Sequence, residues 1–231
     1  KRKMMKKLLI IFLWLSPLFS YGQGFEFLPV SIRQLIEHKH FALAFSEDYR
    51  QPLWVYYELT PEKARSQKIK SLEPFRFKKD PAVRSGSADP SDFKGSGYYP
   101  GQLMPAGDCR FSEEALKECF YLTNASPQKP IFTQGPWFHL EEKVREWAIK
   151  HGPLNIAAGG IFNYTLDTIG ENEVVVPGDF YKVIVDNNGP DKKAIAFILP
   201  HEEIDEPVDE YVVTVDKVED KTGINFFQEL P

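Results

Sequence analysis

The alternation of apolar and polar residues predicts a chain built mostly of strands. Short runs rich in aromatic and β-branched residues, bounded by turn-forming residues, predict strands at seven places. They span residues 41–45, 53–59, 120–124, 154–162, 180–185, 194–199 and 211–215. The Gln51-Pro52 pair is expected to break the chain between the first two strands. The Gly159-Gly160 pair is expected to mark a bulge or turn.

A helical period replaces the alternation in the middle of the chain. Between Pro136 and Lys150 apolar residues recur every three or four positions: Trp137, Leu140, Val144, Trp147 and Ala148. Pro136 suits a first helical position, and Gly152-Pro153 stops the pattern. A shorter helix is expected from Phe111 to Cys119 with Ser112 as its cap. Helices beside many strands indicate the α+β class.

Two polar segments lie between the early strands and the centre of the chain. Residues 61–79 hold seven lysines and arginines and two glutamates. They form either a solvated face or a rim that faces phosphates, and the sequence leaves both interpretations open. Residues 80–97 are dense in Gly, Ser, Pro and Asp, which predicts a loop.

Composition and charge limit the class of protein. The chain has 231 residues, 42% of them hydrophobic, and a formal net charge of −5. This hydrophobic content is typical of a folded domain and excludes a disordered chain. No linker or internal repeat divides residues 23–231, so one domain is expected there. The acidic balance disfavours long-range attraction of nucleic acid, but a local basic groove is compatible with it.

The N-terminal residues have the pattern of a signal peptide. Five lysines and arginines precede a short apolar run, and small residues precede Gln23. Residues 1–22 are therefore expected to be removed on export, which leaves the protein in the periplasm or secreted. The apolar run is too short to span a membrane, so no membrane association is expected.

Cys109 and Cys119 are the two cysteines of the chain. In an exported protein they could form a disulfide, and the alternative is a pair of free, buried thiols. Spacing alone does not give the Cα separation that a bridge needs. Neither cysteine has the spacing of a metal site or a catalytic nucleophile.

Three motifs between Ser96 and Glu141 resemble a known family. They read S-G-Y-Y-P-G-Q-L-M-P-A-G-D from Ser96, T-N-A-S-P-Q from Thr123 and T-Q-G-P-W-F-H-L-E from Thr133. They resemble the DNA/RNA non-specific endonucleases, or ββα-metal (His-Me finger) nucleases. In these the motifs read S-G-Y-D-R-G-H-L-x-P-A-x-D, T-N-x-x-P-Q and N-x-G-x-W-x-x-L-E. The resemblance covers residues 40–231 and implies a central antiparallel sheet with flanking helices.

The resemblance implies a defined chemistry. In that family the His of D-R-G-H is the general base for the attacking water, and a Mg²⁺ (or Mn²⁺) ion on the helix Asn polarises the phosphate. Here the D-R-G-H positions hold Tyr99, Pro100, Gly101 and Gln102. Gln102 thus occupies the catalytic position, and an amide cannot accept the proton. Pro100 removes the arginine's charge.

The remaining site positions are partly retained. Thr133 occupies the metal ligand's position, where a hydroxyl is a weaker ligand for a hard dication than a carbonyl oxygen. Glu141 matches the residue that supports the metal's waters, and Arg145 matches the catalytic arginine near the phosphate. Asn124 and Gln134 match positions expected to bind substrate. The spacing of Glu141 and Arg145 also fits an ordinary helix salt bridge.

No histidine is expected to replace the missing base. His139 lies two residues before Glu141 and should point away from it on the helix. The sequence places all five on the surface or in packing positions: His38, His40, His139, His151 and His201.

Two hypotheses follow. The first is an exported family member that has lost most or all catalysis and keeps a role in binding nucleic acid or a protein partner, such as a nuclease inhibitor. The second is a divergent but active metal-dependent endonuclease, in which Glu141, Asn124 or a metal-bound water does the work. Loss of the base alone need not abolish activity, because a general base contributes about 10²–10⁴-fold.

Overall fold

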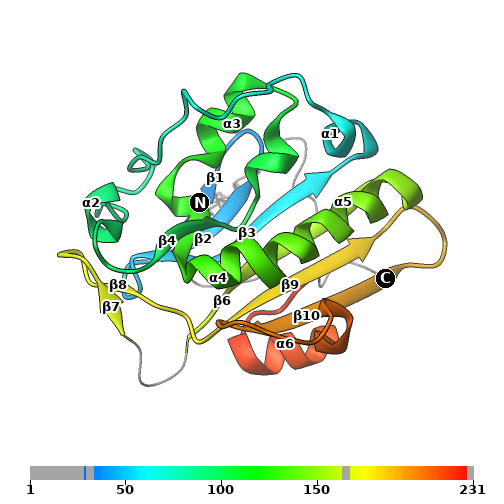
Figure 1. Ribbon diagram of the computed structural model, residues 1–231. Coiled ribbons are helices and arrows are strands. Elements are labelled where there is room, and N and C mark those ends of the chain that lie inside the picture. Colours follow the sequence, from blue (N-terminus) through cyan, green and yellow to red (C-terminus); the bar gives the residue numbers. More distant parts are fainter. Residues whose placement is uncertain (1–28, 30–33, 163–166, 228–231) are drawn as a thin grey trace, which may run out of the picture.

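A seven-stranded antiparallel sheet forms the centre of the computed structural model, which describes residues 29, 34–162 and 167–227 (Figure 1). The strand order is β1-β2-β3-β6-β9-β10-β11. The strands are Gln34–Glu37, Ala42–Ser46, Gln51–Leu59, Leu154–Ile161, Asp179–Asp186, Lys193–Pro200 and Val212–Val213. The α+β class and the central antiparallel sheet are therefore confirmed. The predicted signal peptide lies outside the described residues.

Helices cover both faces of the sheet. The helices α1 to α6 are Pro61–Arg65, Pro90–Phe93, Glu113–Cys119, Pro130–Phe132, Phe138–His151 and Val215–Thr222. Helix α5 runs across β6 and β9 on one face, and α6 lies against β9 and β10 (Figure 1). In the part of the chain that is described, no helix is long and apolar enough to cross a membrane.

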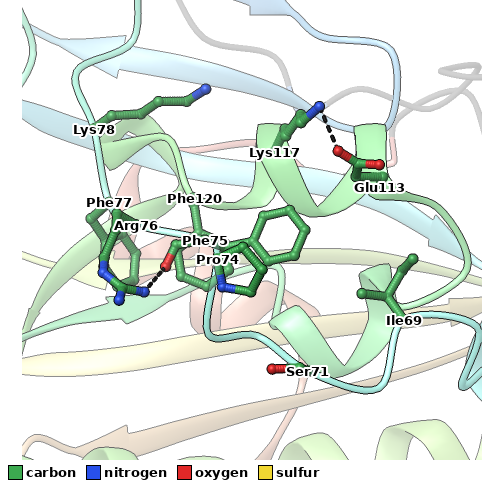
Figure 2. A pocket seen from close by; sticks show the side chains of 10 residues that line it. All are labelled: Ile69, Ser71, Pro74, Phe75, Arg76, Phe77, Lys78, Glu113, Lys117 and Phe120. Atoms are coloured by element: carbon green, nitrogen blue, oxygen red, sulfur yellow. Dashed lines mark hydrogen bonds and ion pairs between the residues drawn. The ribbon is translucent and has the colours of Figure 1, made fainter.

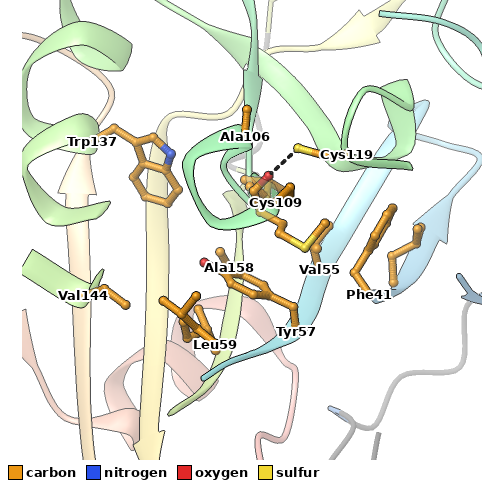
Figure 3. Packing of buried hydrophobic residues seen from close by; sticks show 14 of the residues in the cluster. Phe41, Val55, Tyr57, Leu59, Ala106, Cys109, Cys119, Trp137, Val144 and Ala158 are labelled. Carbon is orange, nitrogen blue, oxygen red and sulfur yellow. Dashed lines mark hydrogen bonds between the residues drawn. The ribbon is translucent and has the colours of Figure 1, made fainter. Parts of the chain in front are cut away.

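The period of two along each strand divides the core into two layers. On β9, Phe180 and Ile184 pack towards α5, whereas Tyr181 and Val183 pack towards α6. Such alternation is what a strand buried on both faces requires. Figure 3 shows the α5 layer, in which Val144 and Trp137 face residues of β3 and β6.

Two short elements flank the main sheet. Strands β4 (Tyr99–Gln102) and β5 (Ala125–Gln128) form a separate antiparallel pair. Strands β7 (Thr168–Ile169) and β8 (Val174–Val175) form another. The β4-β5 pair carries the D-R-G-H positions of the first motif and the end of the second motif.

Strand β3 begins earlier than expected. Gln51-Pro52 does not break the chain. The turn lies at residues 47–50, and Pro52 pairs with Phe45 where the register shifts. A bulge tolerates proline in a strand because it locally disrupts the ladder, which lessens the loss of the proline's N–H.

Two further expectations are wrong. Residues 122–124 form a 3₁₀ turn, and the strand follows at β5. Gly159 and Gly160 lie inside β6 and pair with Tyr181 and Phe180. A Cβ at Gly159 would collide with the Leu53 carbonyl oxygen, so close packing rather than a turn explains this glycine.

Candidate active site

A cleft of about 990 Å³ opens between β4, the loop after α1 and the first turns of α5. It brings together most of the positions selected from the motifs: Tyr99, Pro100, Gly101, Gln102, Thr133, Gln134, Glu141 and Arg145. These residues come from segments far apart in sequence. The cleft is therefore the candidate site.

A distorted turn leads into α5. Residues Thr133–Trp137 form a π-turn, in which Gly135 has non-helical angles (φ −104°, ψ −109°). The expected helix start at Pro136 is thus displaced to Phe138. Trp137 Nε1 donates to the Gln102 carbonyl oxygen at 3.1 Å, which ties this turn to β4. At its other end α5 stops at Gly152, whose φ of +112° favours glycine.

The side chain of Gln102 is held at both ends by hydrogen bonds. Its Nε2 donates to the Cys119 carbonyl oxygen at 3.0 Å. Its Oε1 accepts from the Ala106 backbone N–H at 3.0 Å. The amide is thus fixed against the floor of the cleft, and it offers no basic atom there.

The neighbours of Gln102 on β4 differ in exposure. Tyr99 is 49% exposed at the edge of the cleft. Gly101 is buried, and a Cβ there would collide with the Gln128 side chain. This contact explains why glycine stands at the one D-R-G-H position that matches.

Thr133 and Gln134 lie in the turn that precedes α5 and also line the cleft. The Thr133 hydroxyl lies 3.0 Å from Gln128 Oε1 and 3.2 Å from the Lys129 carbonyl oxygen, and it can donate to either. Gln134 is exposed. The hydroxyl is thus engaged within the protein, whereas the Gln134 amide faces the cleft.

Glu141 is a carboxylate of the cleft whose pKa is raised far above its usual value. Burial raises its pKa to about 7, the cations of Lys182 and Arg145 lower it, and Asp108 raises it. A carboxyl group in this range exchanges its proton near neutral pH.

Arg145 forms its ion pair with Asp108 and not the helix salt bridge with Glu141 that its spacing allowed. Its Nη1 lies 3.0 Å from Asp108 Oδ1, and Tyr57 donates its hydroxyl to Asp108 Oδ2 at 3.1 Å. Asp108 is buried, and burial raises its pKa against the lowering effect of Arg145. The Arg145 side chain, which lines the cleft, is therefore held in place by the buried Asp108 carboxylate.

Asn124, which the sequence analysis expects to bind substrate, is not among the residues that line the cleft. Its side chain is fully buried. Nδ2 donates to the carbonyl oxygens of Met104 and Cys119, and Oδ1 accepts from the Met104 N–H. The amide thus closes the loop between β4 and α3, and in this structure no atom of it is available to a substrate.

None of the five histidines lines the cleft. His139 is largely exposed on α5. His201 is buried between Phe132 and Phe180, where its Nδ1 donates to the Pro177 carbonyl oxygen at 2.9 Å. Its Nε2 accepts from the Lys129 N–H at 2.7 Å. Burial lowers the pKa of His201 to about 4, so the ring is neutral and serves packing.

The cysteines are free thiols in the interior. Cys119 Sγ donates to the Met104 carbonyl oxygen at 3.3 Å (Figure 3). Burial raises the pKa of Cys109 well above its usual value. Of the two alternatives left open by the sequence, the structure has the buried pair of thiols.

The similarity to known proteins extends over this whole site. The model of the DNA/RNA non-specific endonuclease family matches residues 25–231. This chain belongs to the DNA/RNA non-specific endonuclease family.

Relatives with this fold include several named nucleases. The chain is 33% identical to "Nuclease EXOG, mitochondrial" of Xenopus laevis over 93% of its own length and 63% of that protein. It is 31% identical to "Nuclease C1" of Cunninghamella echinulata var. echinulata, covering 87% of this chain and 86% of the relative. It is 28% identical to "Endonuclease G, mitochondrial" of Homo sapiens, over 84% and 70%.

A solved structure has the same architecture. A chain in the crystal structure of the EndoG/EndoGI complex superposes with a TM-score of 0.82 at 26% identity, covering 87% of this chain and 88% of that one. That crystal structure concerns the mechanism of EndoG inhibition.

The family's metal fits these residues poorly. Thr133 supplies a hydroxyl that already donates within the protein, and burial raises the pKa of the Glu141 carboxyl group, which disfavours the charged form that binds a cation. Among residues 34–162 and 167–227 no cluster of three His, Cys, Asp or Glu could hold a metal ion. A hard dication prefers carbonyl and carboxylate oxygens. The described side chains therefore offer it a weak donor set.

Lys182 is a charged residue that the sequence analysis missed. It is fully buried on β9, with its Nζ 4.4 Å from the centre of the Trp137 ring. No hydrogen-bond acceptor for Nζ is found among the described residues. Burial lowers its pKa, and Glu141 and Asp108 raise it. The alternation along β9 already places Lys182 on the same face as Phe180 and Ile184, and this was the available signal.

Proposed function

We propose that this protein binds nucleic acid in the candidate cleft and has lost most or all of the family's phosphodiester hydrolysis. The observation that carries the proposal is the fixed amide of Gln102. Both of its ends are bonded within the protein, and it stands where the family has its general base. Loss of a general base costs about 10²–10⁴-fold in rate, and the engaged Thr133 hydroxyl adds to that loss.

The walls of the cleft support a retained binding role. Three cations line it, Lys70, Arg110 and Arg145, with two carboxylates, Glu141 and Glu142. Exposed aromatic rings stand at its edge: Tyr99 is 49% and Phe138 42% exposed. Tyr99 occupies the family's Asp position, so a carboxylate that repels phosphate is replaced by a ring on which a base can stack.

The test combines cleavage with binding. The natural protein is incubated at high concentration with plasmid and with RNA in Mg²⁺ or Mn²⁺. Beside it runs a variant that carries Tyr99→Asp, Pro100→Arg, Gln102→His and Thr133→Asn. Binding of both proteins to fluorescent DNA and RNA is measured in EDTA.

The proposal expects the natural protein to bind without cutting and the variant to cut at least about 10²-fold faster. Metal-dependent cleavage by the natural protein at the variant's rate would overturn the loss of catalysis. Absence of binding to DNA and RNA would overturn the binding role.

A second candidate function rests on Glu141. A carboxyl with a pKa of about 7 at the wall of the cleft is in the range of a general base at neutral pH. The divergent enzyme would then use Glu141 in place of Gln102, and its activity would be abolished by Glu141→Gln and would rise with pH around 7. In that case Mg²⁺ or Mn²⁺ remains the expected cofactor, and otherwise none is needed.

Partners and compartment extend the proposal. The superposed EndoG chain was crystallised in a complex with EndoGI that concerns EndoG inhibition, so a protein inhibitor or other protein is the alternative occupant of the cleft. Residues 1–22 carry the signal-peptide pattern, and we propose export to the periplasm or the medium. Mass spectrometry of the mature chain tests this, because cleavage must leave Gln23 at the N-terminus.

A further inference from the structure

A second pocket lies beside the candidate cleft and is lined by aromatic and basic side chains. Its volume is about 630 Å³, which falls within the roughly 300–1,000 Å³ of small-molecule sites. Phe75, Phe77 and Phe120 form its apolar wall, and Arg76, Lys78 and Lys117 surround them (Figure 2).

The aromatic wall is a fixed arrangement of rings. The centre of the Phe120 ring lies 5.8 Å from that of Phe75, at an interplanar angle of 24°, and 4.9 Å from that of Phe77. All three rings are half-buried, so each keeps exposed area. Phe75 and Phe120 are thus near parallel and Phe77 is tilted at 47°, and such a preformed ring wall can take a further flat ring at little cost in side-chain entropy.

The charge of the pocket differs from that of the whole chain. Three cations line it against one carboxylate, Glu113, which pairs with Lys117 at 2.7 Å. Lys78 lies over the Tyr121 ring at 4.6 Å. The chain as a whole carries a formal charge of −5. The lining of the pocket is thus net positive in a chain that is net negative, and complementarity favours an anionic ligand.

The pocket adjoins the cleft. Phe77 and Phe120 line both, so the two pockets adjoin each other at these rings, and a strand lying in the cleft needs to pass only these rings to place a base in the pocket. A protein partner would satisfy the apolar wall, but it has no general need for cations at its edge. An unpaired nucleotide needs both, because its base stacks on an aromatic face and its phosphate pairs with Lys or Arg.

We propose that this pocket holds an unpaired base of a single nucleic-acid strand whose continuation lies in the candidate cleft. The inference rests on the proposed nucleic-acid binding and adds a preference for single strands. In a duplex the bases are stacked on one another, so their faces cannot reach the Phe75 ring. DNA and RNA strands share the chemistry that is recognised.

Fluorescence anisotropy in EDTA tests the proposal. The probes are a labelled DNA strand of about ten nucleotides, the RNA strand of the same sequence, and the DNA duplex. The decisive variant is Phe75→Leu, because Phe75 lines the second pocket and not the cleft, and leucine keeps the apolar volume. Lys117→Gln removes one cation from the same pocket.

The proposal expects tighter binding of a single strand than of the duplex. Loss of one stacked base weakens single-strand binding about 5- to 150-fold in Phe75→Leu and leaves duplex binding unchanged. Lys117→Gln, which also leaves Glu113 without its partner, weakens single-strand binding and reduces its salt dependence by at most about one phosphate contact. Phe162→Leu and Lys217→Gln, which lie outside both pockets, are the matched controls and should match the natural protein.

The outcomes separate the two proposals. If the natural protein binds nucleic acid but Phe75→Leu binds single strands equally well, the pocket proposal is wrong and the proposed function stands. Equal affinity for duplex and single strand has the same meaning. If the natural protein binds none of the probes, the proposed function is wrong. The pocket proposal, which rests on it, is then wrong as well. Comparison of the DNA and RNA strands shows which of the two the pocket prefers.

Discussion

The inner and outer residues of the same motifs have diverged to different degrees. The inner residues, Gly101, Asp108, Asn124 and Trp137, match the family and are buried in contacts that hold the cleft together. The outer residues, Tyr99, Pro100, Gln102 and Thr133, line the cleft and differ from the family. The packing of the site is thus kept while four of the groups that line the cleft are replaced, and Gln134, Glu141 and Arg145, which also line it, still match the family. Folding and chemistry are separable constraints here, because they act on different atoms of one motif.

The buried ion pair between Asp108 and Arg145 should show the largest effect on stability, and it tests whether the inner residues hold the cleft together. Asp108→Ala leaves the Arg145 guanidinium uncompensated and removes the acceptor of the Tyr57 hydroxyl. We expect a loss of about 3–5 kcal/mol in the free energy of unfolding, measured in urea.

An exposed ion pair supplies the control for Asp108→Ala. Asp209→Ala breaks the pair with Lys143 on the surface and should cost no more than about 1 kcal/mol. Equal effects of the two substitutions would show that the inner residues are not what holds the cleft.

His201 predicts a pH dependence of the scaffold. Its folded pKa is about 4, against about 6.5 when unfolded. Between these values the unfolded chain binds the extra proton, so this contribution is complete above pH 6.5 and is lost as pH falls to 4. The difference amounts to about 3 kcal/mol at 1.36 kcal/mol per pKa unit.

Urea midpoints measured from pH 7 to pH 4.5 check this dependence. His201→Gln should remove this part of the slope, and a variant of the exposed His139 should leave it in place. Parallel slopes for the natural protein and His201→Gln would contradict the neutral, buried ring.

Gln102 stands at the boundary between the two groups of residues. Gln102→Ala removes the donor to the Cys119 carbonyl oxygen and the acceptor for the Ala106 N–H. We expect the free energy of unfolding to fall by about 1–3 kcal/mol. Thermal and urea denaturation measure the loss. A neutral effect would mean that the amide is not fixed, and lost catalysis would then have no geometric support at this position.

Tyr99 should give the smallest effect on folding. Tyr99→Ser changes a side chain that is 49% exposed, so we expect a change within about 0.5 kcal/mol in stability. Binding of nucleic acid should weaken, because the ring at the edge of the cleft is removed. Unchanged binding beside unchanged stability would leave Tyr99 without a role in the site.

The sequence predicted the main strands and α5, because periodicity reports which side chains are buried. It failed at Pro52, Gly159 and residues 122–124. At these positions the backbone depends on contacts with distant segments, such as the register shift opposite Phe45. Propensity alone does not contain that information.

The site shows the same division. Motif spacing brought Gln102, Thr133, Glu141 and Arg145 into one cleft, but it placed Asn124 there as well. Spacing gives the order of residues and not the direction of a side chain, so the buried amide of Asn124 could not be told from a substrate ligand. The pairing of Arg145 with Asp108, 37 residues apart, was likewise invisible.

The buried thiol of Cys119 allows local opening at the floor of the cleft to be measured by its rate of alkylation. Its carbonyl oxygen accepts from both Gln102 and Asn124, and its own thiol is fully buried. An alkylating reagent can reach the sulfur only when these bonds open, so the rate of modification reports the free energy of that local opening. The rate of Cys119 modification therefore measures how rigidly the scaffold of the cleft is held. A ligand that stabilises the closed cleft will lower this rate without contacting the cysteine.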